Sequence, residues 1–186
     1  MKALITTLLL LTLTLTSAFG QLKGRIGGNQ AITNDWRPGF INITELSCGM
    51  GLGKTDVPYS QSFVGLNNTF AYQFMRRIKG GAGIGIQFHN DGVLIPLYLD
   101  GRFNFPNGKW SPFISAAGGY AMSPDNFKDQ SRIYFNPVAG VRLIYKKNLA
   151  YTISAGLLTQ AGGTEMRSSF INLKLGAEFK ARNGRY

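Results

Sequence analysis

Residues 93–105 read Val-Leu-Ile-Pro-Leu-Tyr-Leu-Asp-Gly-Arg-Phe-Asn-Phe, and this stretch decides the fold of the chain. Every odd position except Gly101 is apolar, whereas the even positions from 98 onward are Tyr98, Asp100, Arg102 and Asn104. A period of two residues is typical of a β-strand. A strand with one apolar face and one face carrying a carboxylate and a guanidinium needs lipid or a core on the first side. On the second side it needs water or ion-pair partners.

The same alternation recurs along the rest of the chain after residue 38. The segments are about 40–52, 62–76, 82–88, 111–121, 134–145, 149–157 and 171–179. With 93–105 they make eight segments, and most are close to the roughly 9–11 residues that cross a bilayer at a tilt. An even number of strands suits closure of an up-and-down barrel. The sequence therefore predicts an all-β fold: an eight-stranded, antiparallel, up-and-down membrane β-barrel. Pro137 is a departure, because proline removes a donor from the hydrogen-bond ladder.

The first twenty residues have the features of a secretory signal peptide. Lys2 is followed by an apolar run over 4–15 and by the small-residue pattern Ser-Ala-Phe-Gly at 17–20. The run is short for a spanning helix, so we expect cleavage after Gly20. We predict a signal at 1–20, an N-terminal periplasmic extension at 21–37, the barrel at 38–180 and a C-terminal tail at 181–186. The single cysteine, Cys48, cannot form an internal disulfide.

The quoted residues resemble a known family, the small eight-stranded outer-membrane β-barrel proteins of Gram-negative bacteria, in the porin-like group. Besides 95–105, the resemblance is carried by Ser-Pro-Phe-Ile-Ser-Ala-Ala-Gly-Gly-Tyr at 111–120, Asn-Pro-Val-Ala-Gly-Val-Arg at 136–142 and the last strand ending at Phe179. The resemblance implies a location in the cell outer membrane. It also implies a strand-terminal aromatic, Phe179 or Tyr186, that the barrel assembly machinery reads.

Strand parity sorts the charged residues between the interior and the two ends of the barrel. Six fall on inward positions and form a predicted lumen charge network with equal numbers of each sign: Glu45, Asp100, Arg102, Arg142, Lys174 and Glu178. Buried ions must be paired because an unpaired one costs several kcal/mol. Closure places the first strand beside the last, so we expect Glu45 to pair with Lys174. The interior of eight strands is just wide enough to be filled by side chains.

The chain as a whole is strongly basic, with a formal charge of +11. Most of the excess falls in or near the short connections, which in such barrels face the periplasm. A predicted periplasmic basic cluster consists of Arg76, Arg77, Lys79, Lys146 and Lys147. We expect anionic phospholipid or cell-wall polymer to face this cluster, or the cluster to be simply solvated. Nucleic acid is not expected, because the chain has no basic helix, zinc spacing or stacking motif.

Two motifs suggest chemistry without supplying the residues for it. Cys-Gly-Met-Gly-Leu-Gly-Lys-Thr at 48–55 ends like a phosphate-binding loop, but it has Cys48 where glycine is required and no helix is expected after it. His89, the only histidine, is followed by Asn90 and Asp91, and no nucleophile lies beside it in the sequence. We therefore predict no catalytic residue, no metal site and no cofactor.

The predicted function is that of a non-enzymatic outer-membrane barrel with a packed lumen and a structural or surface-interaction role. Its expected partners are lipopolysaccharide, anionic phospholipid, the barrel assembly machinery and surface partners of the outer loops. Two alternatives remain at this point. One is a small porin that passes ions or small solutes. The other is a soluble secreted barrel with its apolar face inside, in which Asp100, Arg102 and Arg142 would point to solvent.

Overall fold

The computed structural model describes residues 38–53, 59, 61–90, 92–105, 110–124, 131–146, 148–162 and 168–181. The predicted signal and N-terminal extension, and residues 182–186 of the predicted tail, lie outside the described residues. No helix in the described part is long and apolar enough to cross a membrane.

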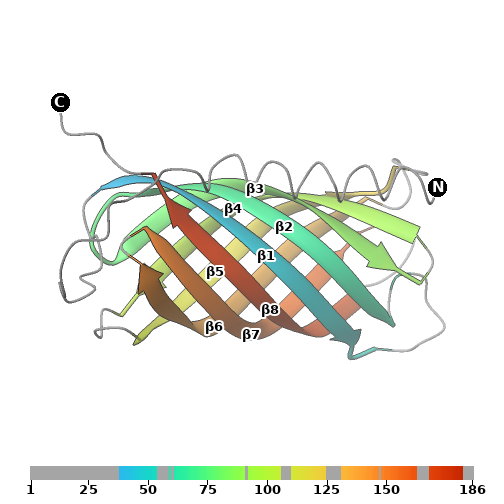
Figure 1. Cartoon of the computed structure of the whole chain (residues 1–186). Coiled ribbons are helices and arrows are strands. Elements are labelled where there is room, and N and C mark those ends of the chain that lie inside the picture. The colour runs from blue at the N-terminus through green and yellow to red at the C-terminus, as the bar shows by residue number, and fades with distance from the viewer. Residues whose placement is uncertain are drawn as a thin grey trace, which may run out of the picture. The chain divides into compact units, whose positions relative to one another are not determined.

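Eight antiparallel strands close into one barrel, as predicted (Figure 1). Each strand pairs with its neighbours in sequence, and β1 pairs with β8 to complete the ring. The strands are β1 Gly39–Gly51, β2 Ser62–Gln73, β3 Ile78–His89, β4 Gly92–Asn104, β5 Trp110–Met122, β6 Arg132–Lys146, β7 Leu149–Ala161 and β8 Ser168–Lys180.

Several strands extend beyond the ranges that the sequence pattern predicted, β3 and β7 among them. β3 begins at Ile78 rather than Ala82, and β7 continues to Ala161 rather than Leu157. In β3 the extra residues include Gly80 and Gly81, which have no apolar side chain to extend the alternation, yet they pair with Tyr72 and Ala71 of β2. Pairing with neighbouring strands fixed these ends, and a single strand's pattern does not contain that information.

The outer face of the barrel is a belt of exposed apolar side chains. Phe40, Leu99 and Phe70 are each about 70% exposed, as single examples from β1, β4 and β2. The belt continues around the barrel on β3 and β5 to β8, with Ile84, Ile114, Phe135, Ile153 and Leu173. Continuous apolar surface of this extent is stable against lipid rather than water. This excludes the soluble barrel, because the charged face is inside and the apolar face outside.

Two strand prolines, Pro137 and Pro96, each coincide with an interruption of one ladder. Pro137 on β6 pairs with Ala116 of β5, but on the β7 side the pairing stops between Phe135 and Val138. Pro96 on β4 pairs with Ala121 of β5, and the ladder to β3 is interrupted beside it in the same way. Because proline has no N–H donor, each of these two residues loses pairing with one neighbouring strand and keeps pairing with the other.

Two inward glycines make room for rings on the neighbouring strand. Gly83 of β3 lies opposite Tyr98 of β4, and a Cβ at Gly83 would lie 2.4 Å from Cζ of that tyrosine. Gly49 of β1 likewise lies opposite Phe63 of β2, where a Cβ would lie 2.2 Å from Cε1 of the phenylalanine.

The two ends of the barrel differ in their connections. We call one end the short-turn end. It contains the start of β1, the end of β8 and the connections 74–77, 105–109 and 147–148. The other, the long-loop end, has the connections 52–61, 123–131 and 162–167. The hairpin between β3 and β4, residues 90–91, is a short connection at the long-loop end. Short turns face the periplasm in barrels of this kind.

Candidate functional site

The six residues of the predicted lumen charge network all lie inside the barrel. They come from four strands: Glu45 from β1, Asp100 and Arg102 from β4, Arg142 from β6, and Lys174 and Glu178 from β8. Each is at most 6% exposed. The strand period alone sets this placement, because inward positions alternate with lipid-facing ones along every strand.

Arg102 is the hub of the network because it approaches all three carboxylates. Its Nε lies 2.6 Å from Oδ2 of Asp100, and its Nη2 lies 2.8 Å from Oε1 of Glu45. Its third nitrogen, Nη1, lies 4.0 Å from Oε1 of Glu178. A guanidinium presents its donors in a planar fork, so one side chain can bridge several acids where an ammonium would act as a single point charge.

Glu178 is the second meeting point of the network. Its Oε2 accepts from Nζ of Lys79 at 2.8 Å and also from Nε of Arg142. The predicted pair of Glu45 with Lys174 is present at 3.8 Å, but Arg102 lies closer to the same carboxylate. The contact that sequence adjacency suggested is therefore the weaker of the two.

Lys79 corrects the prediction for the periplasmic basic cluster. We placed it in a solvated turn, whereas it lies inside the barrel, is 1% exposed and pairs with Glu178. The cause is the early start of β3, which gives residue 79 the same parity as the inward residues Gln87 and His89. Extending the β3 alternation backwards would have found it. The network thus holds four cations and three carboxylates rather than three of each.

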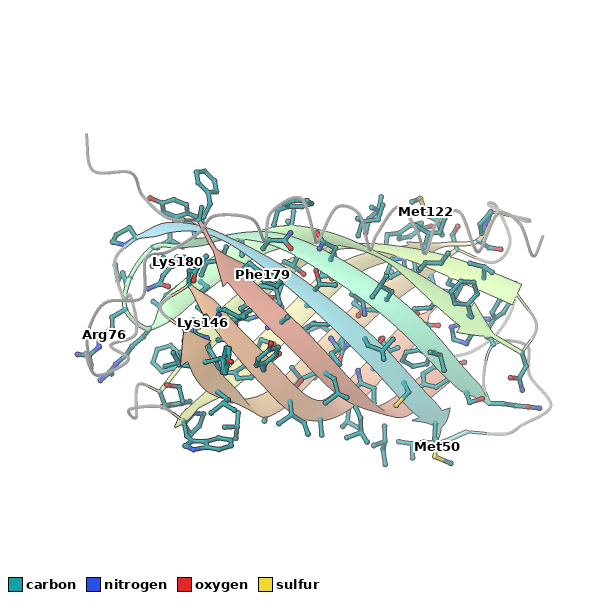
Figure 2. All side chains as sticks on the ribbon, viewed as in Figure 1. Met50, Arg76, Met122, Lys146, Phe179 and Lys180 are labelled. Carbon is teal, nitrogen blue, oxygen red and sulfur yellow. The ribbon has the colours of Figure 1, made fainter. Side chains whose placement is uncertain are left out.

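The other described members of that cluster lie at the surface. Arg76 and Arg77 are exposed in the connection between β2 and β3, and Lys146 is exposed at the end of β6. Figure 2 shows Arg76 and Lys146 at the same end of the barrel as Lys180 and Phe179, with Met50 and Met122 at the opposite end. Lys147 lies outside the described residues.

Tyrosine and amide side chains lie in the lumen on the long-loop side of the charge network. The Tyr98 hydroxyl lies 3.0 Å from that of Thr69, and the rings of Tyr98 and Tyr134 stack at 5.6 Å. Asn136 donates to the Tyr134 hydroxyl at 3.1 Å. Nearer the long-loop end, Gln160 of β7 donates to Gln87 of β3 at 3.1 Å. Since β3 and β7 are four strands apart in a ring of eight, this bond crosses the lumen.

An aromatic cluster lies inside the barrel towards the long-loop end. Tyr59, from the connection between β1 and β2, is 3% exposed and has a left-handed backbone with a φ of 62°. Its ring contacts His89 edge to face at 5.5 Å, and the Arg132 guanidinium lies 5.3 Å above it. The rings of Phe63 and Phe170 pack against each other and against the same histidine. His89 is therefore a packed ring in an aromatic cluster.

Within the described residues, no three of His, Cys, Asp and Glu come together in a way that could hold a metal ion. The phosphate-loop-like stretch begins in β1, where Cys48 and Met50 face outward towards lipid. Residues 54 and 55 of that stretch lie outside the described residues.

No protein-family model and no curated protein matches the sequence. Several solved structures match in fold. Neisserial surface protein A has a TM-score of 0.57 and 11% identity, over 76% of this chain and 97% of the other. A de novo designed transmembrane β-barrel has a TM-score of 0.50 and 18% identity, over 78% and 98%. The N-terminal β-barrel domain of Pseudomonas aeruginosa OprF is also similar, with a TM-score of 0.49 and 17% identity, over 77% and 100%.

The chain has the fold of the small eight-stranded outer-membrane β-barrels, as its sequence resemblance implied. The closed ring, the lipid-facing belt and the charged interior define this class of protein. The predicted location in the outer membrane accords with this fold and with the apolar belt.

Proposed function

We propose that the chain is a non-enzymatic outer-membrane barrel with a sealed lumen and a structural or surface-interaction role. The observation that carries this proposal is that side chains from strands three and four places apart in the ring meet inside the barrel. Lys79 of β3 reaches Glu178 of β8 at one level, and Gln87 of β3 reaches Gln160 of β7 at another. The four side chains are at most 3% exposed.

A filled interior opposes the alternative of a small porin. An open channel needs side chains along its wall that water and solutes can reach. Here Arg102, Glu45, Asn67 and Asn172 are buried although they are polar and face the lumen. Eight-stranded barrels have an interior of the width that side chains fill. Ion pairs that join strands across this interior also hold the ring closed, which is a structural role.

The packing around His89 opposes a catalytic role for this residue, the candidate base considered in the sequence. His89 lies among the rings of Tyr59, Phe63 and Phe170, a packing that supports a structural role for the imidazole. We therefore assign no enzymatic activity to the barrel. Outer-membrane lipid, lipopolysaccharide included, is the partner proposed for the apolar belt. The barrel assembly machinery is the partner proposed for the terminal aromatic, Phe179 or Tyr186.

Planar-bilayer recording tests the sealed lumen directly. The protein is refolded in detergent, its closure is checked by the shift in gel mobility between unboiled and boiled samples, and it is then inserted into the bilayer. We expect the folded form to give no large, steady conductance. A steady conductance from material that shows the mobility shift would overturn the sealed lumen and favour the small porin. If the protein were soluble and showed no mobility shift, the membrane barrel itself would be overturned.

A further inference from the structure

Charge is distributed unevenly between the inside and the outside of the barrel. All three described carboxylates, Glu45, Asp100 and Glu178, point into the lumen. Within the described part of the chain, the exposed charged side chains are Arg76, Arg77 and Lys146, and all are at the short-turn end. The other two short connections add Lys109 and Lys147 in the sequence and no acidic residue. Connections at the long-loop end contain the acidic residues Asp56, Asp91, Asp125, Asp129 and Glu165.

The turn between β2 and β3 combines this charge with apolar groups. Phe74 and Met75 are 55% and 63% exposed and immediately precede Arg76 and Arg77. The backbone of the turn is fixed: the N–H groups of Phe74 and Met75 donate to the carbonyl of Ile78 at 3.1 and 3.4 Å. The carbonyl of Arg77 accepts from the Asn104 N–H of β4 at 2.8 Å. The apolar and cationic side chains of this turn therefore lie next to one another on a hydrogen-bonded backbone.

A second basic and aromatic group lies on the hairpin of β6 and β7, across the barrel. Nζ of Lys146 lies 5.4 Å from the ring centre of Tyr145, and this ring lies 6.0 Å from that of Tyr151. Both tyrosines are about half exposed on the lipid-facing side. Tyrosine rings are enriched at the boundary between hydrocarbon and headgroups, where one end of the ring is apolar and the other wet. This group therefore lies at the depth where lipid phosphates are found.

We propose that each of these two groups binds anionic phospholipid headgroups; together they make up the short-turn rim, defined by Phe74, Met75, Arg76, Arg77, Tyr145 and Lys146. Phe74 and Met75 enter the acyl boundary, and the two guanidinium groups bind the headgroup phosphate, for which their forked donors are suited. Negative lipid complements a rim whose described charges are all positive. The inference rests on the proposed position of the barrel in a membrane.

Spin-labelled lipids test the proposal and its premise separately. The refolded protein is placed in phosphatidylcholine vesicles that contain either spin-labelled phosphatidylglycerol or spin-labelled phosphatidylcholine. The motionally restricted fraction of each label is measured by electron paramagnetic resonance. A restricted fraction of any lipid reports that the belt is in the membrane, whereas the ratio between the two labels reports headgroup preference. We expect preference for phosphatidylglycerol, reduced by up to about fivefold for each arginine removed at low salt.

Three variants make the test specific to the rim. Arg76→Gln/Arg77→Gln should lose most of the preference while keeping the gel mobility shift. Lys54→Gln/Lys128→Gln, which removes the same charge from connections at the long-loop end, should keep it. Arg76→Lys/Arg77→Lys should lose part of it, because charge remains without the fork. Equal preference in the wild type and the glutamine variant, or equal loss in the control, would overturn the proposal. The proposal would also be overturned if only the glutamine variant lost binding to cell-wall sacculi while its preference for phosphatidylglycerol stayed unchanged.

Discussion

Replacing Arg102 by methionine tests whether contact geometry or net charge governs the interior. The network holds one more cation than carboxylates, so loss of either Arg102 or Lys174 leaves it balanced. A count of charges therefore predicts the same effect for Arg102→Met and Lys174→Met. The structure predicts very different effects, because the two cations differ in what they contact.

Arg102 lies within 2.6 and 2.8 Å of Asp100 and Glu45 and within 4.0 Å of Glu178. Its removal leaves Asp100, which has no other ion pair in the described part of the chain, buried and uncompensated. Breaking a buried pair in this way costs roughly 3–5 kcal/mol. Within the described residues Lys174 makes one ion pair, in which its Nζ lies 3.8 Å from the Glu45 carboxylate that Arg102 also contacts. We expect Lys174→Met to cost less than about 1 kcal/mol, because the carboxylate keeps its closer partner and an isolated cation no longer needs desolvation.

The assay is equilibrium unfolding by urea in phosphatidylcholine vesicles, followed by gel mobility and by tryptophan fluorescence. Adding Asp100→Asn to Arg102→Met removes the abandoned charge and should restore part of the lost stability, which a double-mutant cycle measures. Equal free energies of unfolding for the two methionine variants would refute the reasoning. It would mean that balance of charge, rather than the contacts of Arg102, sets the stability of the interior.

Three further predictions concern the rest of the lumen. Lys79→Met should destabilise the barrel by less than Arg102→Met, because Glu178 retains Arg142; an unchanged urea midpoint would contradict the burial of Lys79. Gly83→Ala should cost about 1–3 kcal/mol by pushing the Tyr98 ring off its partners, whereas Gly101→Ala, where a Cβ meets nothing within 4 Å, should cost little in the same urea assay. Tyr59→Ala should expose the aromatic cluster at the long-loop end of the lumen. In a Cys48→Ser background, the thiol introduced by Leu158→Cys should react faster with a small thiol reagent once Tyr59 is replaced by alanine. Equal reaction rates would show that Tyr59 does not shield this end of the lumen.

The sequence by itself determined the fold class and which face of each strand is inside. A two-residue period assigns every side chain of a strand to one of two faces, so Asp100 and Arg102 were placed in the lumen before any pairing was known. The same alternation placed Glu45, Arg142, Lys174 and Glu178 there. The eight strands and their order around the ring also follow from local signals, because an up-and-down barrel pairs each strand with its neighbour in the chain.

Tertiary structure alone decided which inward residues meet. Parity says that a side chain is inside but says nothing of its height in a tilted ring or of its rotamer. Glu45 was therefore expected beside Lys174 and instead lies closest to Arg102 of β4. Lys79 joined the network because pairing with β2 and β4 extended β3 beyond its alternating pattern. Likewise, Tyr59 belongs to no strand, and only packing against His89 and Arg132 assigns it to the lumen. Contacts across the ring depend on closure, and no single strand contains that information.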